Sequence, residues 1–155
     1  MAISKRKLMA SVAAVWALSC APMATASDTK FEITYLALTQ HIESGINSTT
    51  DYNANHKFIG LEYRAGKHGY AVASFRNSFY EQSYLIDYAR YWKWSANVEL
   101  SARIGAVTGY EHHQDYCGKV CLFSSVGVAY TANKNFIPKL SFAPGVFVLS
   151  FSIRF

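Results

Sequence analysis

The chain has 155 residues, of which 51% are hydrophobic and 15% aromatic, and its formal net charge is +5. This length suits a single domain. Lys5, Arg6 and Lys7 supply three of the positive charges, so the part after Ala26 carries only +2, and it contains no basic run and no glycine-rich phosphate loop. Composition and charge therefore give no support to nucleic-acid binding, and we expect no cofactor.

The first 26 residues have the pattern of a secretory signal peptide. Three basic residues precede an apolar run from Leu8 to Leu18, and Ala24-Thr25-Ala26 is a small-residue cleavage site. The apolar run is too short to cross a bilayer as a helix, which argues against a membrane anchor. Leu18-Ser19-Cys20 leaves lipoprotein cleavage as an alternative. We predict a signal peptide over residues 1–26 and a mature domain over residues 27–155.

Cleavage after Ala26 would leave two cysteines, Cys117 and Cys121, in the sequence CGKVC. In an exported protein a disulfide between them persists, because the compartment is oxidising. The alternative is a zinc site that recruits His112 and His113, but their spacing from the cysteines matches no strong zinc motif. We therefore predict a disulfide that closes a loop, and no metal site.

The mature sequence shows the period of β-strands rather than of helices. Stretches of about ten residues rich in Tyr, Phe, Val and Ile alternate with turn residues, and no helical period persists over three turns. Eight strands are expected, over residues 30–41, 57–65, 70–80, 83–93, 97–110, 122–131, 136–143 and 145–155.

The last stretch alternates large apolar residues with small or polar ones up to the final residue. Its apolar face consists of Phe147, Leu149, Phe151, Ile153 and Phe155. In a soluble β-sandwich such a face packs on a core, whereas in a transmembrane barrel it faces lipid and the polar face lines the interior. Periodicity alone does not distinguish these two folds.

Three further features favour the barrel over the sandwich. Aromatic residues gather at strand ends, as in Tyr91-Trp92-Lys93-Trp94 and Phe79-Tyr80, where interfacial girdles lie. The two longest connections, residues 42–56 and 111–121, fall on the same side, opposite the termini. The polar faces carry charges of both signs that could neutralise one another in a narrow interior: Glu32, Glu62, Asp87, Glu99, Arg64, Arg103, Lys139 and Arg154.

We therefore predict an all-β protein, an eight-stranded antiparallel transmembrane β-barrel of the bacterial outer membrane that works as a monomer. The terminal alternation ending in Phe155 resembles the signal through which the barrel-insertion machinery recognises such proteins. The interior of an eight-stranded barrel is filled by side chains or holds one small ligand, which excludes a porin.

The candidate chemical residues are Asn77 and Ser78, at the end of the third expected strand. Such residues most often make local hydrogen bonds in turns. A catalytic role would require a base near the Ser78 hydroxyl, because an unassisted hydroxyl is a weak nucleophile. His41 and His56 are expected at the same end of the barrel as Ser78, whereas His68 is expected at the opposite end.

The run GYAVASFRNSFYEQSYLIDYARYW, residues 69–92, resembles a segment of the PagP family of lipid A palmitoyltransferases. In that family an aromatic and small-residue strand ends in a Lys-Asp-Ser-Trp element, and the next strand ends in Tyr-Gly-Trp. The resemblance extends over residues 57–155 through the segments LSARIGAVTG, SSVGVAY, IPKLSFAPG and SFSIRF.

This resemblance implies a barrel that takes a phospholipid acyl chain into its lumen and transfers it to lipid A, the acylated anchor of lipopolysaccharide, in the outer leaflet. The catalytic Ser of the family corresponds to Ser78, and its His to His41, with His56 as a rival base. The family Asp corresponds to Asn77, which cannot bear a carboxylate charge. We expect Asn77 to orient or polarise the acyl carbonyl instead.

The resemblance also implies substrate contacts within the barrel wall. Ala89 falls where the family places the small residue that limits acyl length, and Tyr88 and Arg76 are expected to contact the substrate as well. Three functions follow: acyl transfer from phospholipid to lipid A, ester hydrolysis of lipid A with the same Ser and His, and a non-catalytic barrel that binds through its loops or stabilises the membrane.

Overall fold

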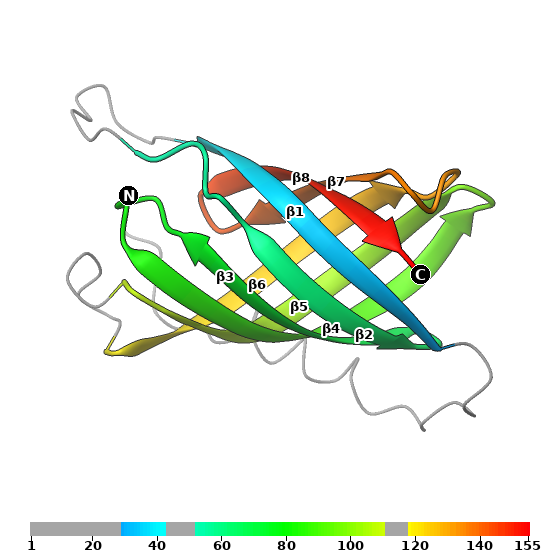
Figure 1. Cartoon of the computed structure of the whole chain (residues 1–155), viewed down its shortest axis with the longest axis horizontal. Helices are drawn as coiled ribbons and strands as arrows, with labels where there is room; N and C mark the ends of the chain where they lie inside the picture. The colour runs from blue at the N-terminus through cyan, green and yellow to red at the C-terminus, as the bar shows by residue number, and fades with distance from the viewer. Residues whose placement is uncertain (1–28, 43–51, 111–117) are drawn as a thin grey trace, which may run out of the picture.

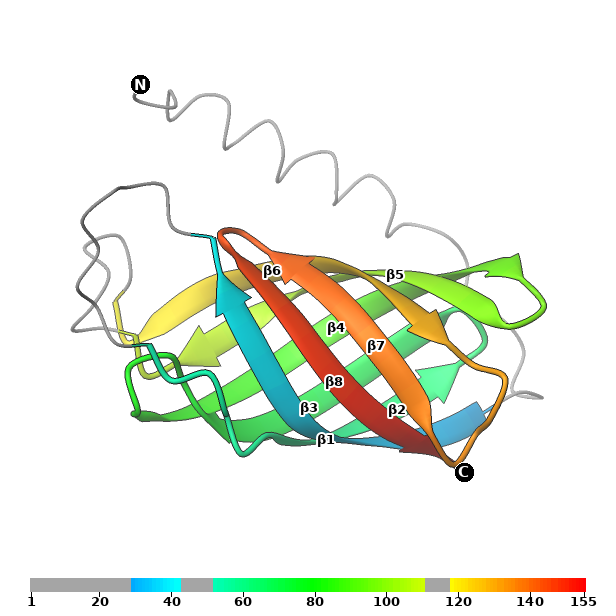
Figure 2. The same ribbon diagram turned by 90° about the horizontal axis from the view of Figure 1, so that it is seen from above.

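The computed structural model describes residues 29–42, 52–110 and 118–155. These residues form a closed barrel in which each strand pairs antiparallel with its neighbours in the chain, and β1 pairs with β8 (Figures 1 and 2). No helix in these three ranges is long and apolar enough to cross a membrane. The strands are β1 (Thr29–His41), β2 (Ile59–Ala65), β3 (His68–Arg76), β4 (Gln82–Ser95), β5 (Val98–Thr108), β6 (Val120–Tyr130), β7 (Ile137–Ala143) and β8 (Val146–Arg154).

All eight strands predicted from the sequence are present, with ends displaced by a few residues. The predicted and observed strands agree because polar and apolar residues alternate along each strand, whose successive side chains point to opposite faces of the wall. β8 closes the barrel by pairing Ile153 with Ile33 and Leu149 with Leu38 of β1. The start of β1 and the end of β8 lie at the same end of the barrel, which we call the termini end; the opposite end is the loop end (Figure 1).

The outer wall is apolar. Ile86 is 62% exposed and Leu122 is 83% exposed, fractions that in water would leave large hydrophobic side chains unburied. Other exposed hydrophobic residues, among them Tyr63, Tyr70 and Val126, continue this surface around the wall. An apolar exterior around a polar interior is the distribution of a membrane-spanning barrel, and closed barrels with an even number of antiparallel strands are the form found in bacterial outer membranes. The protein is therefore an outer-membrane barrel.

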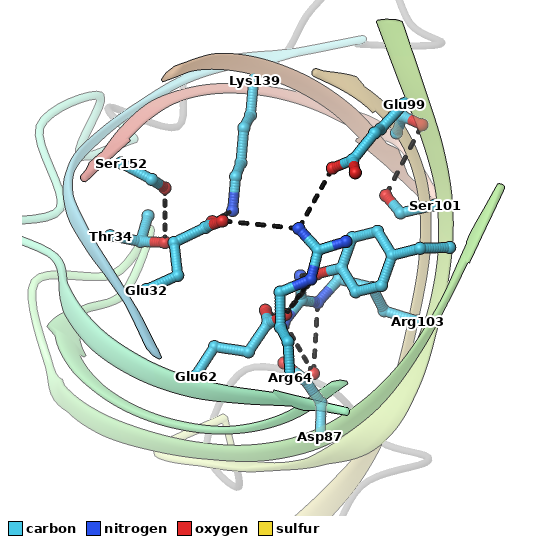
Figure 3. Close-up of polar contacts among 12 residues, drawn as sticks. Glu32, Thr34, Glu62, Arg64, Asp87, Glu99, Ser101, Arg103, Lys139 and Ser152 are labelled. Atoms are coloured by element: carbon cyan, nitrogen blue, oxygen red, sulfur yellow. Dashed lines mark hydrogen bonds and ion pairs between the residues drawn. The ribbon is translucent and has the colours of Figure 1, made fainter. Parts of the chain in front are cut away.

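The interior holds the charges, as the sequence predicted. Glu32 on β1 is fully buried, and its carboxylate accepts a hydrogen bond from the Lys139 ammonium group and another from Arg154 Nε at 2.9 Å. Arg64 Nη1 contacts Glu99 Oε2 at 3.0 Å (Figure 3), and Arg154 Nη2 contacts the same oxygen at 2.9 Å. Charges from β1, β2, β5, β7 and β8 therefore meet in one cluster.

A second group of contacts extends this cluster towards the loop end of the interior. Arg103 Nη2 contacts Glu62 Oε2 at 2.7 Å and Asp87 Oδ1 at 2.9 Å. The Tyr91 hydroxyl donates to Glu62 Oε1 at 2.6 Å, and the Arg64 guanidinium lies 3.6 Å from the centre of the Tyr91 ring. We call the eight charged residues the ionic core: Glu32, Glu62, Asp87, Glu99, Arg64, Arg103, Lys139 and Arg154.

The ionic core fills the barrel. The pocket between Tyr91, Glu99, Arg103 and Lys139 has a volume of about 20 Å³, enough for about one water molecule. The expectation that the lumen takes up an acyl chain is therefore wrong for this protein, because its cross-section is occupied by paired charges. The expected role of Tyr91 in an aromatic girdle is also wrong: Tyr91 points inward, whereas Trp94 near the termini end is 75% exposed.

Replacement of Glu32 tests how much the ionic core contributes to stability. Glu32→Ala should lower the free energy of unfolding by about 3–5 kcal/mol, because Lys139, Arg154 and Arg64 would lose a buried counter-charge. Urea titration in lipid vesicles measures it, with the gel-mobility difference between folded and unfolded barrel as the signal. The exposed Lys134→Ala serves as the control and should change this value by no more than about 0.5 kcal/mol. Equal changes in the free energy of unfolding for the two variants would contradict the contribution that we assign to the ionic core.

Candidate functional site at the loop end

The loop end brings together the Ser and the His that the sequence singled out. His41 is the last residue of β1, and Ser78 lies in the connection between β3 and β4. His41 Nε2 is 2.9 Å from Ser78 Oγ, although the two residues are 37 positions apart in the chain. Ser78 is only 7% exposed. The arrangement is a Ser–His pair at the rim of the barrel.

A β-bulge in β1 turns His41 towards Ser78. The pairing of β1 with β8 shifts between Tyr35 and Ala37, and Leu36 has a positive φ of 54°. Glu32 faces inward before the bulge and Ala37 is buried after it, so the bulge moves the inward face from even to odd positions. His41 consequently faces the inside of the rim; without the bulge it would face lipid.

Asn77 organises the turn that holds Ser78. Its side chain is fully buried. Oδ1 accepts hydrogen bonds from the backbone N–H groups of Phe79, at 2.9 Å, and Glu81, at 3.0 Å, while Nδ2 donates to the Gly109 carbonyl. These partners fix the orientation of the amide, because Oδ1 faces two donors and Nδ2 faces an acceptor. The expected orientation of an acyl carbonyl by Asn77 gains no support, since its side chain points into the turn.

Asn53 is a second buried amide that positions Ser78, and no sequence pattern pointed to it. Its backbone N–H donates to the Ser78 carbonyl at 2.8 Å, and Nδ2 donates to the Asn77 carbonyl at 3.0 Å. The connection after β1 is thereby fastened to the turn after β3. A single Asn in a loop cannot be distinguished from an ordinary turn residue without knowledge of its partners.

Three aromatic rings surround the Ser–His pair. The Tyr52 ring stacks on the His41 ring with centroids 4.2 Å apart, and Phe79 lies edge-on to Tyr52 at 5.7 Å and to Tyr110 at 6.1 Å. The Tyr110 hydroxyl is hydrogen-bonded to the side chain and the backbone of Ser78. Burial raises the pKa of Tyr110, although the bonds from Ser78 act in the opposite direction. Tyr110 is therefore a neutral phenol at neutral pH.

His56, the rival base, does not contact Ser78. Its Nδ1 lies 2.6 Å from the Arg76 carbonyl and its Nε2 lies 2.7 Å from Thr39 Oγ1. A carbonyl only accepts, so Nδ1 carries the proton and Nε2 accepts from the Thr39 hydroxyl. Burial lowers the pKa of His56, and the nearby His41 lowers it further. His56 therefore links β1 to β3 as a neutral ring and is not the base for Ser78.

The three expected substrate contacts do not share a pocket. Ala89 is fully buried among the interior residues of β4, next to the ionic core. Tyr88 points to the outer wall, where its hydroxyl is 2.7 Å from His68 Nδ1. Arg76 is exposed at the loop end of β3. No single acyl chain could contact all three.

The predicted disulfide involves a residue beyond the described ranges. Cys121 is buried near the start of β6, at the loop end of the barrel. Cys117, His112 and His113 lie outside the described residues, as does the expected signal peptide over residues 1–26. The pairing of Cys117 with Cys121, the zinc alternative and the cleavage after Ala26 therefore stay predictions.

Comparisons with known proteins identify the fold and no family. No family model matches the chain, and no curated protein matches it. A de novo designed transmembrane β-barrel is similar with a TM-score of 0.55 and 10% identity, over 82% of this chain and 95% of the designed one. The attachment invasion locus protein Ail of Yersinia pestis is similar at 16% identity in two structures. The structure in a phospholipid bilayer nanodisc has a TM-score of 0.47 and covers 83% of this chain and 100% of Ail. The crystal structure has a TM-score of 0.46 and covers 82% of this chain and 97% of Ail.

Replacement of Asn77 by Asp tests its assignment to the turn. Asn77→Asp should lower the free energy of unfolding by about 1–3 kcal/mol, because a carboxylate oxygen would replace the donor that faces the Gly109 carbonyl. Asn135→Asp is a matched control: Asn135 is exposed at the termini end, and within the described residues its one hydrogen bond to a side chain runs from its backbone N–H to Asn133 Oδ1, at 2.9 Å. Urea titration compares the two variants. An Asn77→Asp variant as stable as the control would show that the amide is dispensable.

The pKa of His56 gives a test of its buried, neutral state. We expect the His56 ring to titrate below 6.5, with the proton on Nδ1 above that midpoint. Because the folded pKa is depressed, the unfolded chain takes up the proton first, so stability falls as the pH drops below about 6.5. NMR of the ring signals in micelles measures the midpoint, and His56→Gln identifies the signal. A midpoint at or above 6.5 would contradict this assignment.

Proposed function

We propose that this outer-membrane barrel performs acyl-ester chemistry on membrane lipids at its loop end, with Ser78 and His41 as the reacting pair. The observation that carries the proposal is the 2.9 Å contact between His41 Nε2 and Ser78 Oγ. The specific form we favour is transfer of a phospholipid acyl chain to lipid A in the outer leaflet. The resemblance of residues 69–92 to the PagP family supports that choice of substrates.

The pair has the geometry for nucleophilic catalysis. His41 Nε2 can take the proton of Ser78 Oγ while Oγ attacks the ester carbonyl of the donor lipid. His41 then returns the proton to the departing alcohol, which leaves an acyl group on Ser78. A hydroxyl of the acceptor lipid, deprotonated by His41, attacks this acyl group and regenerates Ser78. With water as the acceptor, the same steps amount to ester hydrolysis.

The surroundings of the pair favour a lipid acceptor over water. The rings of Tyr52, Phe79 and Tyr110 pack around His41 and Ser78, and Ser78 is nearly buried. Exclusion of water from an acyl-transfer site suppresses hydrolysis of the acyl intermediate. This packing supports a transferase more than a lipid A hydrolase.

The acyl chains of the substrates lie along the outside of the barrel in this proposal. The ionic core occupies the interior, whereas the outer wall near Ser78 is apolar, with Tyr80, Tyr84 and Ile86 all more than half exposed. A hydrocarbon chain is stabilised against such a wall and would be destabilised among buried charges. Lipid in the outer leaflet would thus reach the rim without entering the barrel.

The partners follow from the same surfaces. They are phospholipid and lipid A at the rim, and the barrel-insertion machinery at β8, whose outward residues Phe147 and Leu149 are exposed and lead to Phe155. We expect the protein to act as a monomer, without nucleic acid or cofactor.

A non-catalytic barrel that binds through its loops, or that stabilises the membrane, is the second candidate. The observation that favours it concerns Asn77. Its side-chain hydrogen bonds in the described residues go to backbone groups, the N–H groups of Phe79 and Glu81 in the turn and the Gly109 carbonyl after β5. This residue therefore supplies neither the carboxylate of the PagP family nor an amide aimed at a substrate. The Ser–His pair would then be a structural hydrogen bond.

Mass spectrometry of lipid A distinguishes these functions. Cells that lack their own lipid A acyl-modifying enzymes would express the protein, Ser78→Ala or His41→Gln. We expect lipid A to gain one acyl chain with the unaltered protein, and each variant to reduce that gain at least about 100-fold, because each removes one partner of the proton transfer. Ser74→Ala is the matched control, since Ser74 lies on β3 and bonds only to Gln82 in the described residues.

Each outcome assigns a function. A gain that survives in the Ser74→Ala control and is lost in the Ser78→Ala variant supports the transferase, and loss of an acyl chain from lipid A indicates the hydrolase. An unchanged spectrum, from barrels shown by heat-dependent gel mobility to be folded, would reject catalysis on lipid A in favour of the non-catalytic barrel.

A further inference from the structure

A charged group interrupts the apolar outer wall near the termini end. Arg90 on β4 alternates with the buried Ala89 and Tyr91, so its side chain points outward. It pairs across the wall with His68, the first residue of β3 after the turn at Gly66. Tyr88, two positions before Arg90, lies on the same face. These three residues form what we call the wall triad.

In the wall triad, Arg90 donates a hydrogen bond to His68, and His68 donates one to Tyr88. Arg90 Nη1 lies 2.7 Å from His68 Nε2, and His68 Nδ1 lies 2.7 Å from the Tyr88 hydroxyl. A guanidinium can only donate, so His68 Nε2 accepts and His68 Nδ1 carries the ring proton. That proton is donated to the Tyr88 oxygen, which leaves the Tyr88 hydroxyl proton directed away from the triad.

The wall triad therefore presents donors and no counter-charge. Arg90 retains N–H groups beyond the one given to His68, and Tyr88 retains its hydroxyl proton. Within the three described ranges no carboxylate pairs with Arg90; Asp87, three residues before it on β4, points inward to Arg103, as does Glu62 on β2. The outer wall thus carries a positive charge whose partner is not supplied by these parts of the chain.

The depth of the triad indicates where such a partner would come from. His68 follows directly on the turn at the termini end, so the triad lies where the hydrocarbon gives way to lipid headgroups. An arginine that faces lipid is strongly destabilising at the middle of the bilayer and nearly neutral close to the bilayer surface. Phosphodiester groups at that surface offer a negative charge and several acceptor oxygens, which a guanidinium binds well.

We propose that the wall triad is a binding site for the phosphodiester of a phospholipid in the leaflet at the termini end. Arg90 and Tyr88 donate to the phosphate oxygens, and His68 holds both side chains in place. The acyl chains lie against the apolar wall, where Tyr70 packs next to Tyr88 with ring centroids 5.6 Å apart. This site is at the opposite end of the barrel from Ser78 and does not depend on the function proposed for that residue.

Retention of defined lipids by the purified, full-length barrel tests this proposal. The protein in non-ionic detergent would be incubated with dioleoylphosphatidylglycerol or with dioleoylglycerol, which has the same chains and no phosphate, and bound lipid would be counted by native mass spectrometry. We expect retention of the phospholipid only. Arg90→Gln should weaken it about tenfold and Tyr88→Phe about threefold, because each loses a donor to a charged acceptor.

Matched controls separate the triad from general effects. Lys134→Gln removes a positive charge at the same end, and Tyr130→Phe removes an exposed phenol on β6; neither should change retention. Heat-dependent gel mobility verifies that each variant is folded, and Tyr88→Phe carries the test should Arg90→Gln misfold.

Three results would overturn the proposal. Equal retention of dioleoylglycerol would show that the chains alone bind, and equal losses in Lys134→Gln and Arg90→Gln would show a diffuse charge effect. Displacement of the phospholipid by inorganic phosphate alone would make the triad a site for free anions rather than for lipid.

Discussion

Opposite charges inside the barrel hold six of its eight strands in register, namely β1, β2, β4, β5, β7 and β8. Glu32 meets Lys139 and Arg154, and Arg103 meets Glu62 and Asp87, so each pair joins different strands. A slip of one residue in any of these six strands would carry its charge to the lipid face and leave a partner unpaired inside. Any apolar residue can face the lipid, so the outer surface does not specify the strand register. The buried ion pairs supply this specificity, as a packed hydrophobic core does in a soluble protein.

Because the ionic core closes the interior, binding and chemistry are left to the ends and the outer wall. The loop end is held by neutral groups that are nearly all hydrogen-bonded: the amides of Asn53 and Asn77, the ring of His56 and the phenol of Tyr110. These hydrogen bonds join the connections after β1, β3 and β5 to one another without using a charged side chain. The same barrel can therefore keep a precise Ser–His contact at one end and an arginine at the edge of the membrane at the other.

The sequence predicted the strands, their two faces and the eight charges of the interior, because all three depend on a period of two residues. It also predicted that His41 and Ser78 share one end, because strand order fixes the ends of an antiparallel barrel. It did not reveal Asn53, Tyr52 or Tyr110, whose roles depend on partners distant in the chain. Nor did it reveal the bulge at Leu36, since leucine rarely adopts a positive φ and gives no signal for one.

The bulge at Leu36 has a consequence for how this barrel could diverge. Deleting Leu36 would restore a regular strand and leave Ala37 opposite Ser150, so every residue from Ala37 to His41 would keep its present facing. If Leu36 stayed and paired regularly, these residues would turn to the opposite face, and Gln40 would point to the rim in place of His41. Loss of the bulge without loss of a residue would thus exchange the chemistry of the rim while leaving Glu32 and the ionic core in place.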